Sequence, residues 1–364
     1  MGRGRLIMAA GAALLLAAGC GSGGSGGSAP SSGAPAAGNA TIALFLPESK
    51  TTRYEKFDKP IFEAKVKQLC AGCTVLYFNA DQDAAKQQSQ VESALTQGAK
   101  VLVLDAVDAA AVAPLVNQAK QKKIPVIGYD RLISGIGYEY FVSFDNVTVG
   151  KVQGEALLGE LTKRGTADKG QVVMINGSPT DPSSADYKKG AHMALDGKVK
   201  IGAEFDTPDW SPDKAQQQTE QAITSLGRDS IVGVYSANDG MATGAVAALK
   251  RAGYTTLPAL TGQDAEVTAV QRILTGEQTM TIYLNIKQQA ETAGEAAVAL
   301  AKGEKPKTTT TVNNGTADIP STILDPIAVT KDKIKDTIVK DGFYSVSEIC
   351  TPDFAAACKE AGLS

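Results

Sequence analysis

The chain has 364 residues, of which 43% are hydrophobic and 21% charged, and its formal net charge is −3. This length and composition are typical of a globular protein with two domains. The 36 basic residues are scattered among 39 acidic ones, which argues against a nucleic-acid binder. The one histidine, His192, excludes a multi-histidine metal site and is expected to lie on a helix surface or in packing. No cofactor and no metal ligands are predicted.

Residues 1–20 have the pattern of a bacterial lipoprotein signal peptide. Two arginines precede an apolar run from Leu6 to Ala18, and small residues lead to Cys20. The apolar run is too short to form a stable transmembrane helix. We therefore expect export and lipidation of Cys20, with an ordinary secretory signal and an incidental cysteine as the alternative. Residues 21–40, rich in Gly, Ser and Pro, are expected to form a flexible tether.

The remaining four cysteines form an even set in an exported chain, which predicts two short-range disulfides. We expect Cys70 to pair with Cys73, and Cys350 to pair with Cys358. The alternative for Cys70 and Cys73 is a thioredoxin-like redox motif. That motif is disfavoured because the two cysteines lie between a helix and a strand, whereas a redox motif opens a helix that follows a strand.

From Thr41 onward, predicted strands and helices alternate. In the first half the predicted strands are Thr41–Leu46, Val75–Phe78, Val101–Leu104, Val126–Tyr129 and Phe141–Phe144. In the second half they are Val172–Ile175, Ile201–Phe205, Ile231–Tyr235 and Ala259–Thr261. Segments with helical spacing separate them, which predicts an α/β fold with two doubly wound parallel sheets of similar size.

Polar residues follow these strands at their carboxyl ends, where open α/β sheets bind ligands. The most informative stretch is the apolar run Val126–Tyr129, which stops at Asp130 and Arg131. A structural ion pair that caps the strand is the alternative for these two residues. No glycine-rich dinucleotide or phosphate-binding motif follows a strand. The candidate ligand-binding residues from strand ends and turns are Lys50, Arg53, Asp130, Arg131, Asp181, Trp210, Asn238 and Asp264.

These residue types suit a neutral sugar. Sugar hydroxyls both donate and accept hydrogen bonds, so carboxylates, amides and arginines bind them, while an aromatic ring packs against the C–H face. Trp210 is the only tryptophan and lies at a strand-to-helix turn. We expect its ring to stack on the ligand, with packing in the core as the alternative.

A series of short motifs between residues 41 and 348 resembles the periplasmic sugar-binding proteins of ABC importers, in particular the members that bind D-xylose. The motifs include Arg53-Tyr-Glu-Lys56, Tyr129-Asp-Arg131, Asp209-Trp210, Ala237-Asn-Asp239 and Gly262-Gln-Asp264. The resemblance implies the type I periplasmic-binding-protein fold, in which two Rossmann-like lobes joined by three crossings enclose the sugar. It assigns ligand contacts to the candidate residues above other than Lys50, and Ser183 is a further candidate.

The resemblance also implies the domain organisation. Crossings are expected near Phe144–Asp145, near Asp264 and near Asn313. The N-terminal lobe then comprises residues 41–144 and 265–312, and the C-terminal lobe comprises residues 145–264 and 313–364.

Two positions depart from the D-xylose pattern. Leu284 stands where a lysine is usual, and Ser183 stands where an asparagine is usual. Each lost hydrogen bond is worth about 1 kcal/mol, so the identity of the sugar stays open between D-xylose and another pentose or hexose such as ribose, arabinose, glucose or galactose.

The expected function is reversible capture of a monosaccharide without catalysis. A monomeric lipoprotein, anchored to the outer face of the cell membrane, would deliver the sugar to an ABC permease and its ATPase. A sugar-sensing subunit for a chemoreceptor or kinase is an alternative. A glycosidase that uses two of Asp130, Asp181 and Asp264 is a further alternative, and a two-lobed repressor is disfavoured because residues 1–40 contain no helix-turn-helix.

Overall fold

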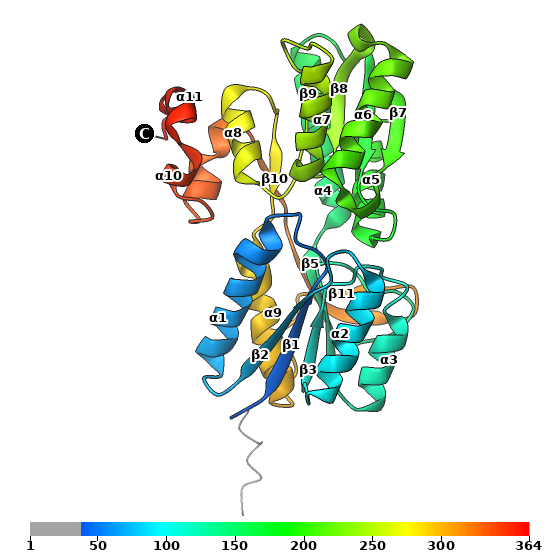
Figure 1. Ribbon diagram of the computed structural model, residues 1–364, viewed down its shortest axis with the longest axis vertical. Helices are drawn as coiled ribbons and strands as arrows, with labels where there is room; N and C mark the ends of the chain where they lie inside the picture. The colour runs from blue at the N-terminus through cyan, green and yellow to red at the C-terminus, as the bar shows by residue number, and fades with distance from the viewer. Residues whose placement is uncertain (1–37, 364) are drawn as a thin grey trace, which may run out of the picture. The chain divides into compact units, whose positions relative to one another are not determined.

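The computed structural model describes residues 38–363. The predicted signal peptide, Cys20 and nearly all of the predicted tether lie outside these residues. The fold contains two large sheets and one small sheet, and helices cover both faces of the large sheets (Figure 1). The predicted α/β fold class with two mainly parallel sheets is therefore confirmed, but the sheets are not of similar size, since they have seven and four strands.

The first large sheet has seven strands in the order β11-β12-β5-β4-β3-β1-β2. Its strands are β1 (Thr41–Leu46), β2 (Thr74–Asn79), β3 (Val101–Leu104), β4 (Val126–Tyr129), β5 (Tyr140–Phe144), β11 (Thr310–Asn313) and β12 (Asp318–Leu324). All neighbours are parallel except β11 and β12. Its helices are α1 (Lys59–Leu69), α2 (Ala84–Thr96), α3 (Ala113–Gln121) and α9 (Ile286–Ala301). Apolar residues of α1 and α9 fill one core cluster on this sheet, and those of α2 and α3 fill the other.

The second large sheet has four parallel strands in the order β7-β6-β8-β9. They are β6 (Gln171–Asn176), β7 (Lys200–Asp206), β8 (Ile231–Ser236) and β9 (Ala259–Leu260). Its helices are α4 (Asn146–Lys163), α5 (Pro182–Leu195), α6 (Pro212–Leu226) and α7 (Asp239–Arg251). Helices α4 and α5 approach so closely that a Cβ on Gly150 would lie 1.9 Å from the carbonyl oxygen of Tyr187. This close approach fixes the position of α5 and therefore of the residues at its amino end.

The small sheet pairs β10 (Thr281–Tyr283) with β13 (Ile327–Val329). A bridge between Gln263 and Ile282 joins β10 to the segment that follows β9. Helices α8 (Val267–Thr275), α10 (Val346–Ile349) and α11 (Ala355–Glu360) complete this region. Both predicted disulfides are present, Cys70–Cys73 and Cys350–Cys358. No helix between residues 38 and 363 is long and apolar enough to cross a bilayer.

The chain passes three times between the first sheet and the rest of the fold. The first passage follows β5, where Phe144–Asp145 was predicted. The predicted crossings near Asp264 and Asn313 are corrected by the strand pairing. Because β10 pairs with β13 and α9 packs on the first sheet, the second passage lies at residues 284–285. Because β12 pairs with β5, the third lies at residues 325–326, and residues 310–324 belong to the first sheet.

The segment that follows β13 also contacts residues of the first-sheet region, at a place separate from the three passages. The ring of Phe57, in a π-helical turn that spans Tyr54–Asp58, stacks on Phe343 with 4.0 Å between the ring centroids. Beside this stack, Lys56 Nζ lies 2.9 Å from Glu348 Oε1. Phe343 and Glu348, which follow β13, therefore contact the turn that precedes α1.

Candidate functional site: a polar pocket lined by both large sheets

A pocket lies where the carboxyl ends of strands from the two large sheets meet. It contains about 320 Å³ of space outside the protein atoms, part of it open to solvent. Residues that follow β1 and β4 line it from the first sheet, and residues that follow β6, β7, β8 and β9 line it from the second. The lining residues are Thr51, Arg53, Tyr54, Asp130, Arg131, Asp181, Tyr187, Trp210, Asn238, Gln263 and Asp264.

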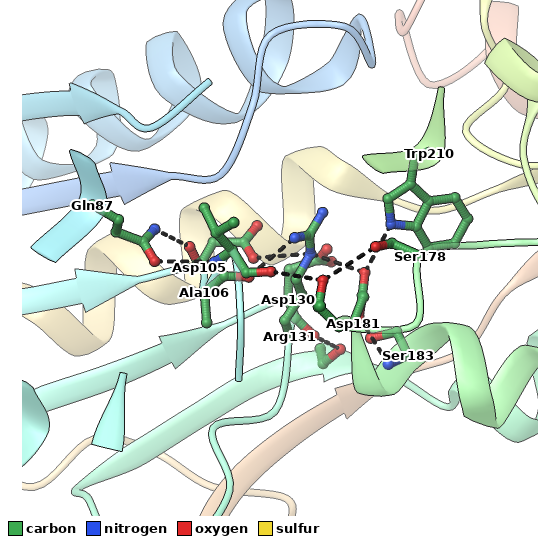
Figure 2. A network of polar contacts seen from close by, with 12 residues as sticks. Gln87, Asp105, Ala106, Asp130, Arg131, Ser178, Asp181, Ser183 and Trp210 are labelled. Carbon is green, nitrogen blue, oxygen red and sulfur yellow. Dashed lines mark hydrogen bonds and ion pairs between the residues drawn. The ribbon is translucent and has the colours of Figure 1, made fainter. Parts of the chain in front are cut away.

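Arg131 and Asp181 form an ion pair between the two sides of the pocket. Arg131 Nε lies 2.9 Å from Asp181 Oδ2, and both side chains are almost fully buried (Figure 2). Asp181 is the N-cap of α5, and its Oδ1 accepts a hydrogen bond from the backbone N–H of Ser183 at 2.9 Å. Burial raises the pKa of Asp181, and the nearby Arg131 guanidinium offsets this shift only in part.

On the side of its own sheet, Arg131 is held by the loop that follows β3. Its Nη1 donates to the carbonyl oxygen of Ala106 at 3.0 Å, and its Nε lies 3.5 Å from Asp105 Oδ1. The carboxylate of Asp105 is fully buried, and neither of its oxygens accepts a hydrogen bond from the described residues. Burial, more than any charge, raises the pKa of Asp105 well above its usual range. Gln87 fixes this loop because its side chain bonds the Asp105 carbonyl oxygen and the Val107 N–H (Figure 2).

Arg53 and Asp130 form a second charged group. Arg53 binds Asp58 through two parallel hydrogen bonds of 2.8 and 3.0 Å, and its Nη1 donates to Asp130 Oδ1 at 3.1 Å. Gln289 of α9 donates to the same Asp130 oxygen at 3.0 Å and accepts from Arg53. The hydroxyl of Tyr129 also donates to Asp58. Because the protein donors converge on Asp130 Oδ1, no group in residues 38–363 donates to Oδ2, which leaves that oxygen for a ligand hydroxyl.

Trp210 closes one side of the pocket. Its indole N–H donates to Asp181 Oδ2 at 3.2 Å (Figure 2). Its ring meets that of Tyr187 edge to face. A Cβ on Gly177 would lie 2.0 Å from the indole, so only glycine allows the ring to lie there. Trp210 is 7% exposed, so most of its ring packs in the core, but it still lines the pocket. This geometry keeps both predicted roles of Trp210 open.

Non-glycine residues in left-handed backbone conformations concentrate at the pocket. Asp130, Asp209, Trp210 and the pair Asp264–Ala265 have φ values of 62°, 60°, 53°, 90° and 50°. Such conformations cost about 1–3 kcal/mol each and persist where the surrounding structure enforces them. Asp130, Trp210 and Asp264 line the pocket, so the fold presents these three side chains at an energetic cost, and Asp209 and Ala265 are their neighbours in the chain.

The charges of the pocket define the ligand that it suits. Its lining carries two arginines and three aspartates. The Arg53 guanidinium is largely engaged by Asp58, Asp130 and Gln289, whereas Arg131 makes one hydrogen bond, to the Ala106 carbonyl oxygen, beside its ion pair with Asp181. Burial raises the pKa of Asp264 well above its usual range, and Arg53 opposes this shift. Such an acceptor-rich site suits an uncharged ligand with several hydroxyl donors rather than an anion. No cluster of His, Cys, Asp and Glu within residues 38–363 is arranged to hold a metal ion.

The structure brings together seven of the predicted ligand residues and separates two from the pocket. Arg53, Asp130, Arg131, Asp181, Trp210, Asn238 and Asp264 all line it. Lys50 is exposed and does not line it, and the hydroxyl of Ser183 accepts a hydrogen bond from Asn146 at 3.1 Å in the first turn of α5. His192 lies away from the pocket, on α5, where it contacts Asp196 and Glu204.

The sequence reasoning missed four lining residues. Thr51 and Gln263 are direct neighbours of predicted residues or motifs, so the strand-end pattern could have included them. Tyr54 directly follows Arg53 and could have been included for the same reason. Tyr187 lies within a helical segment, where nothing distinguishes an aromatic residue that lines a pocket from one in the core.

This fold and this pocket define a two-unit α/β binding protein, and comparison with known proteins identifies its family. Residues 42–305 match the family model described as periplasmic binding protein domain. The chain belongs to this family of binding proteins, so the prediction that it is not an enzyme is confirmed.

Individual relatives agree with this assignment. The D-xylose-binding periplasmic protein of Escherichia coli K12 is 36% identical over 85% of this chain and 92% of that protein. The multiple sugar-binding periplasmic receptor ChvE of Rhizobium radiobacter is 32% identical over 86% of this chain and 93% of that protein. Among solved structures, an ABC transporter solute-binding protein from Clostridium phytofermentans with bound β-D-glucose is similar, with a TM-score of 0.79 and 27% identity. The alignment of the two structures covers 85% of this chain and 99% of the Clostridium phytofermentans chain.

Proposed function

We propose that this chain is the extracytoplasmic binding subunit of an ABC sugar importer and captures one monosaccharide between two lobes. The first lobe comprises residues 41–144 and 286–324, and the second comprises residues 145–283 and 327–363. One observation carries the proposal: a small, acceptor-rich pocket is lined from both large sheets, and Arg131 of one meets Asp181 of the other.

Capture requires contacts from both lobes. A ligand shifts an equilibrium between open and closed forms only through its greater affinity for the closed form. In this proposal Asp130 and Arg131 bind the sugar from the first lobe, and Asn238 and Asp264 bind it from the second. Trp210 packs on a C–H face of the ring. The permease then recognises the closed form.

D-xylose is the proposed ligand, supported by the similarity to the Escherichia coli D-xylose-binding protein. Leu284 is 1% exposed and adds no polar group, and Ser183 hydrogen-bonds within the protein, so neither replaces the usual polar partners. The second candidate function is capture of several sugars, favoured by the similarity to the multiple sugar-binding receptor and to the glucose-bound protein. A receptor of that kind would also be compatible with a sensing role, in which the sugar-bound form is recognised by a chemoreceptor or kinase.

The remaining features of the proposal concern the place of the protein in the cell. Lipidation of Cys20 would anchor the chain to the outer face of the membrane, and the segment between Cys20 and the first lobe would act as its tether. The predicted end of the tether is too late, because the Ala40 carbonyl oxygen already accepts a hydrogen bond from Thr74 N at 3.0 Å. The protein would work as a monomer beside its permease and ATPase. Metabolic labelling with a palmitate analogue tests the anchor, because Cys20→Ser should abolish incorporation of the label.

Isothermal titration of the purified protein with D-xylose, D-ribose, L-arabinose, D-glucose and D-galactose tests the sugar. Binding of D-xylose with a Kd near 1 μM or below, about −8 kcal/mol, is expected. Tight binding of a different sugar would retain the class and reject the specificity. Absence of binding across all five would reject the sugar assignment. Asp264→Ala is expected to remove binding, and unchanged affinity in that variant would contradict the proposed site.

A further inference from the structure

The turn that presents Asp264 to the pocket has an uncommon backbone conformation. Asp264 and Ala265 have φ values of 90° and 50°, a region that favours glycine. Three consecutive backbone N–H groups of this turn are nevertheless bound. Asp264 N donates to the Ile282 carbonyl oxygen at 2.9 Å, Ala265 N to Thr281 Oγ1 at 3.1 Å, and Glu266 N to Asp239 Oδ2 at 3.0 Å. The turn therefore depends on two side chains, Thr281 and Asp239.

The Asp239 carboxylate is dedicated to this task. It is 0% exposed and does not line the pocket. Its Oδ1 accepts from Gln278 Nε2 at 2.8 Å, and its Oδ2 accepts from the Thr281 hydroxyl at 2.8 Å as well as from Glu266 N. The Thr281 hydroxyl, which donates to Asp239, can accept from Ala265 N with its remaining lone pairs. Asp239 and Thr281 thus form one connected unit beneath the turn.

The surroundings of Asp239 are built to keep the carboxylate in place. Arg272 donates to Gln278 Oε1 at 3.0 Å and to the Asp239 carbonyl oxygen at 3.3 Å, so it orients the residue without an ion pair to its carboxylate. A Cβ on Gly262 would lie 1.9 Å from Asp239 Oδ1, so only glycine permits this approach. The backbone N–H of Asp239 donates to the Gln263 carbonyl oxygen at 3.0 Å. Asp239 therefore also fixes the segment that carries Gln263.

We propose that Asp239, acting through the Thr281 hydroxyl and the Glu266 N–H, is a positioning residue that holds Asp264 in the geometry required to bind the ligand. The inference rests on the proposed function. It assigns a role in affinity to two buried residues that do not touch the pocket. Asp239 also directly follows Asn238 in the chain, so the same residue connects the two second-lobe ligand contacts.

Thr281 permits a conservative test. Valine has nearly the shape of threonine but lacks the hydroxyl, whereas serine keeps the hydroxyl and loses only a methyl group. Thr281→Val should weaken the affinity for the tightest-binding sugar of the five-sugar set about 10- to 100-fold, as expected for one or two buried hydrogen bonds. Thr281→Ser should restore the affinity to within about threefold of the wild type. Asp239→Asn should weaken it as well, because the new amide turns an N–H₂ group toward a donor.

A matched variant separates positioning from stability. Thr219 on α6 is also 0% exposed, and its hydroxyl donates to the Ala215 carbonyl oxygen at 2.8 Å, away from the pocket. Thr219→Val should lower the unfolding temperature measured without sugar and leave the sugar affinity unchanged. Loss of affinity in Thr281→Val with rescue in Thr281→Ser would support the proposal.

Two outcomes would overturn it, and they differ. If the wild-type protein binds a sugar and Thr281→Val binds it equally well, Asp239 and Thr281 serve packing alone and this inference is wrong. If the wild-type protein binds none of the five sugars, the proposed function fails and this inference fails with it.

Discussion

Replacement of Arg131 by alanine tests the charge arrangement at the centre of the pocket. The side chain is 3% exposed and contacts Asp181, Asp105 and the Ala106 carbonyl oxygen. Its removal leaves two buried carboxylates without their counter-charge, which costs about 3–5 kcal/mol of unfolding free energy. The sugar affinity should fall by about 2–5 kcal/mol, roughly 30-fold to several thousand-fold.

Denaturant unfolding and isothermal titration measure these two losses. Arg251→Ala is the matched control because the side chain of Arg251 is 73% exposed and meets only the surface residue Glu220. That variant should retain both its stability and its affinity. Arg131→Lys should fall between wild type and Arg131→Ala, since lysine keeps the charge but loses the planar fork. Wild-type affinity in Arg131→Ala would refute the assignment of Arg131 to the site.

The stability deficit of Arg131→Ala should also depend on pH. Burial already raises the pKa of Asp105 and of Asp181, and loss of the guanidinium raises both further. The folded variant then binds more protons than its unfolded state above the pKa of about 3.9 of an unfolded aspartate. Its stability must fall as the pH rises, so the deficit should be larger at pH 8 than at pH 5. A deficit independent of pH would contradict this account.

Three further outcomes are expected. Gly177→Ala should displace the ring of Trp210 and weaken sugar binding at least about tenfold, because a Cβ would overlap the indole; titration measures this loss. Burial lowers the pKa of His192, but its hydrogen bonds to Asp196 and Glu204 outweigh this effect and raise the pKa. The wild-type protein should therefore be more stable than His192→Gln below pH 6.5, and this difference in unfolding free energy should disappear as the pH rises through the folded pKa. The double replacement Cys350→Ser with Cys358→Ser should lower the unfolding free energy by about 2–3 kcal/mol in denaturant titrations, as expected for a short closed loop. An unchanged midpoint would contradict that last estimate.

The sequence predicted the central part of the fold because its strands are apolar runs bounded by polar turns. β1, β3 and β4 are buried along their whole length or nearly so, and a buried parallel strand reads as a continuous hydrophobic run. β11 is mostly exposed, and three of its four residues are polar, so its pattern does not distinguish a strand from a loop. The third crossing was misplaced because the pairing of β12 with β5 joins residues far apart in the chain. The second was misplaced because the pairing of β10 with β13 is likewise invisible in the local sequence pattern.

The site residues were predictable where a charged side chain follows an apolar strand. Asp130, Asp181 and Asp264 each come after an apolar run, and all three line the pocket. The supporting residues were not predictable. Asp239 is adjacent to Asn238 in the sequence. Only the folded structure shows that Asn238 lines the pocket, whereas the Asp239 carboxylate accepts hydrogen bonds from buried donors.

The position of β12 in the first sheet determines the order in which the protein can fold. β5 is hydrogen-bonded on one side to β4 and on the other to β12, which enters only after all residues of the second sheet have been made. Until then the nascent first sheet ends in an open, apolar edge strand, which is a template for pairing with other chains. Parallel pairing across such a long sequence separation is slow, and an unpaired β5 edge favours aggregation. Variants that weaken the β11–β12 hairpin should therefore reduce the yield of folded protein without changing the sugar affinity of the molecules that do fold.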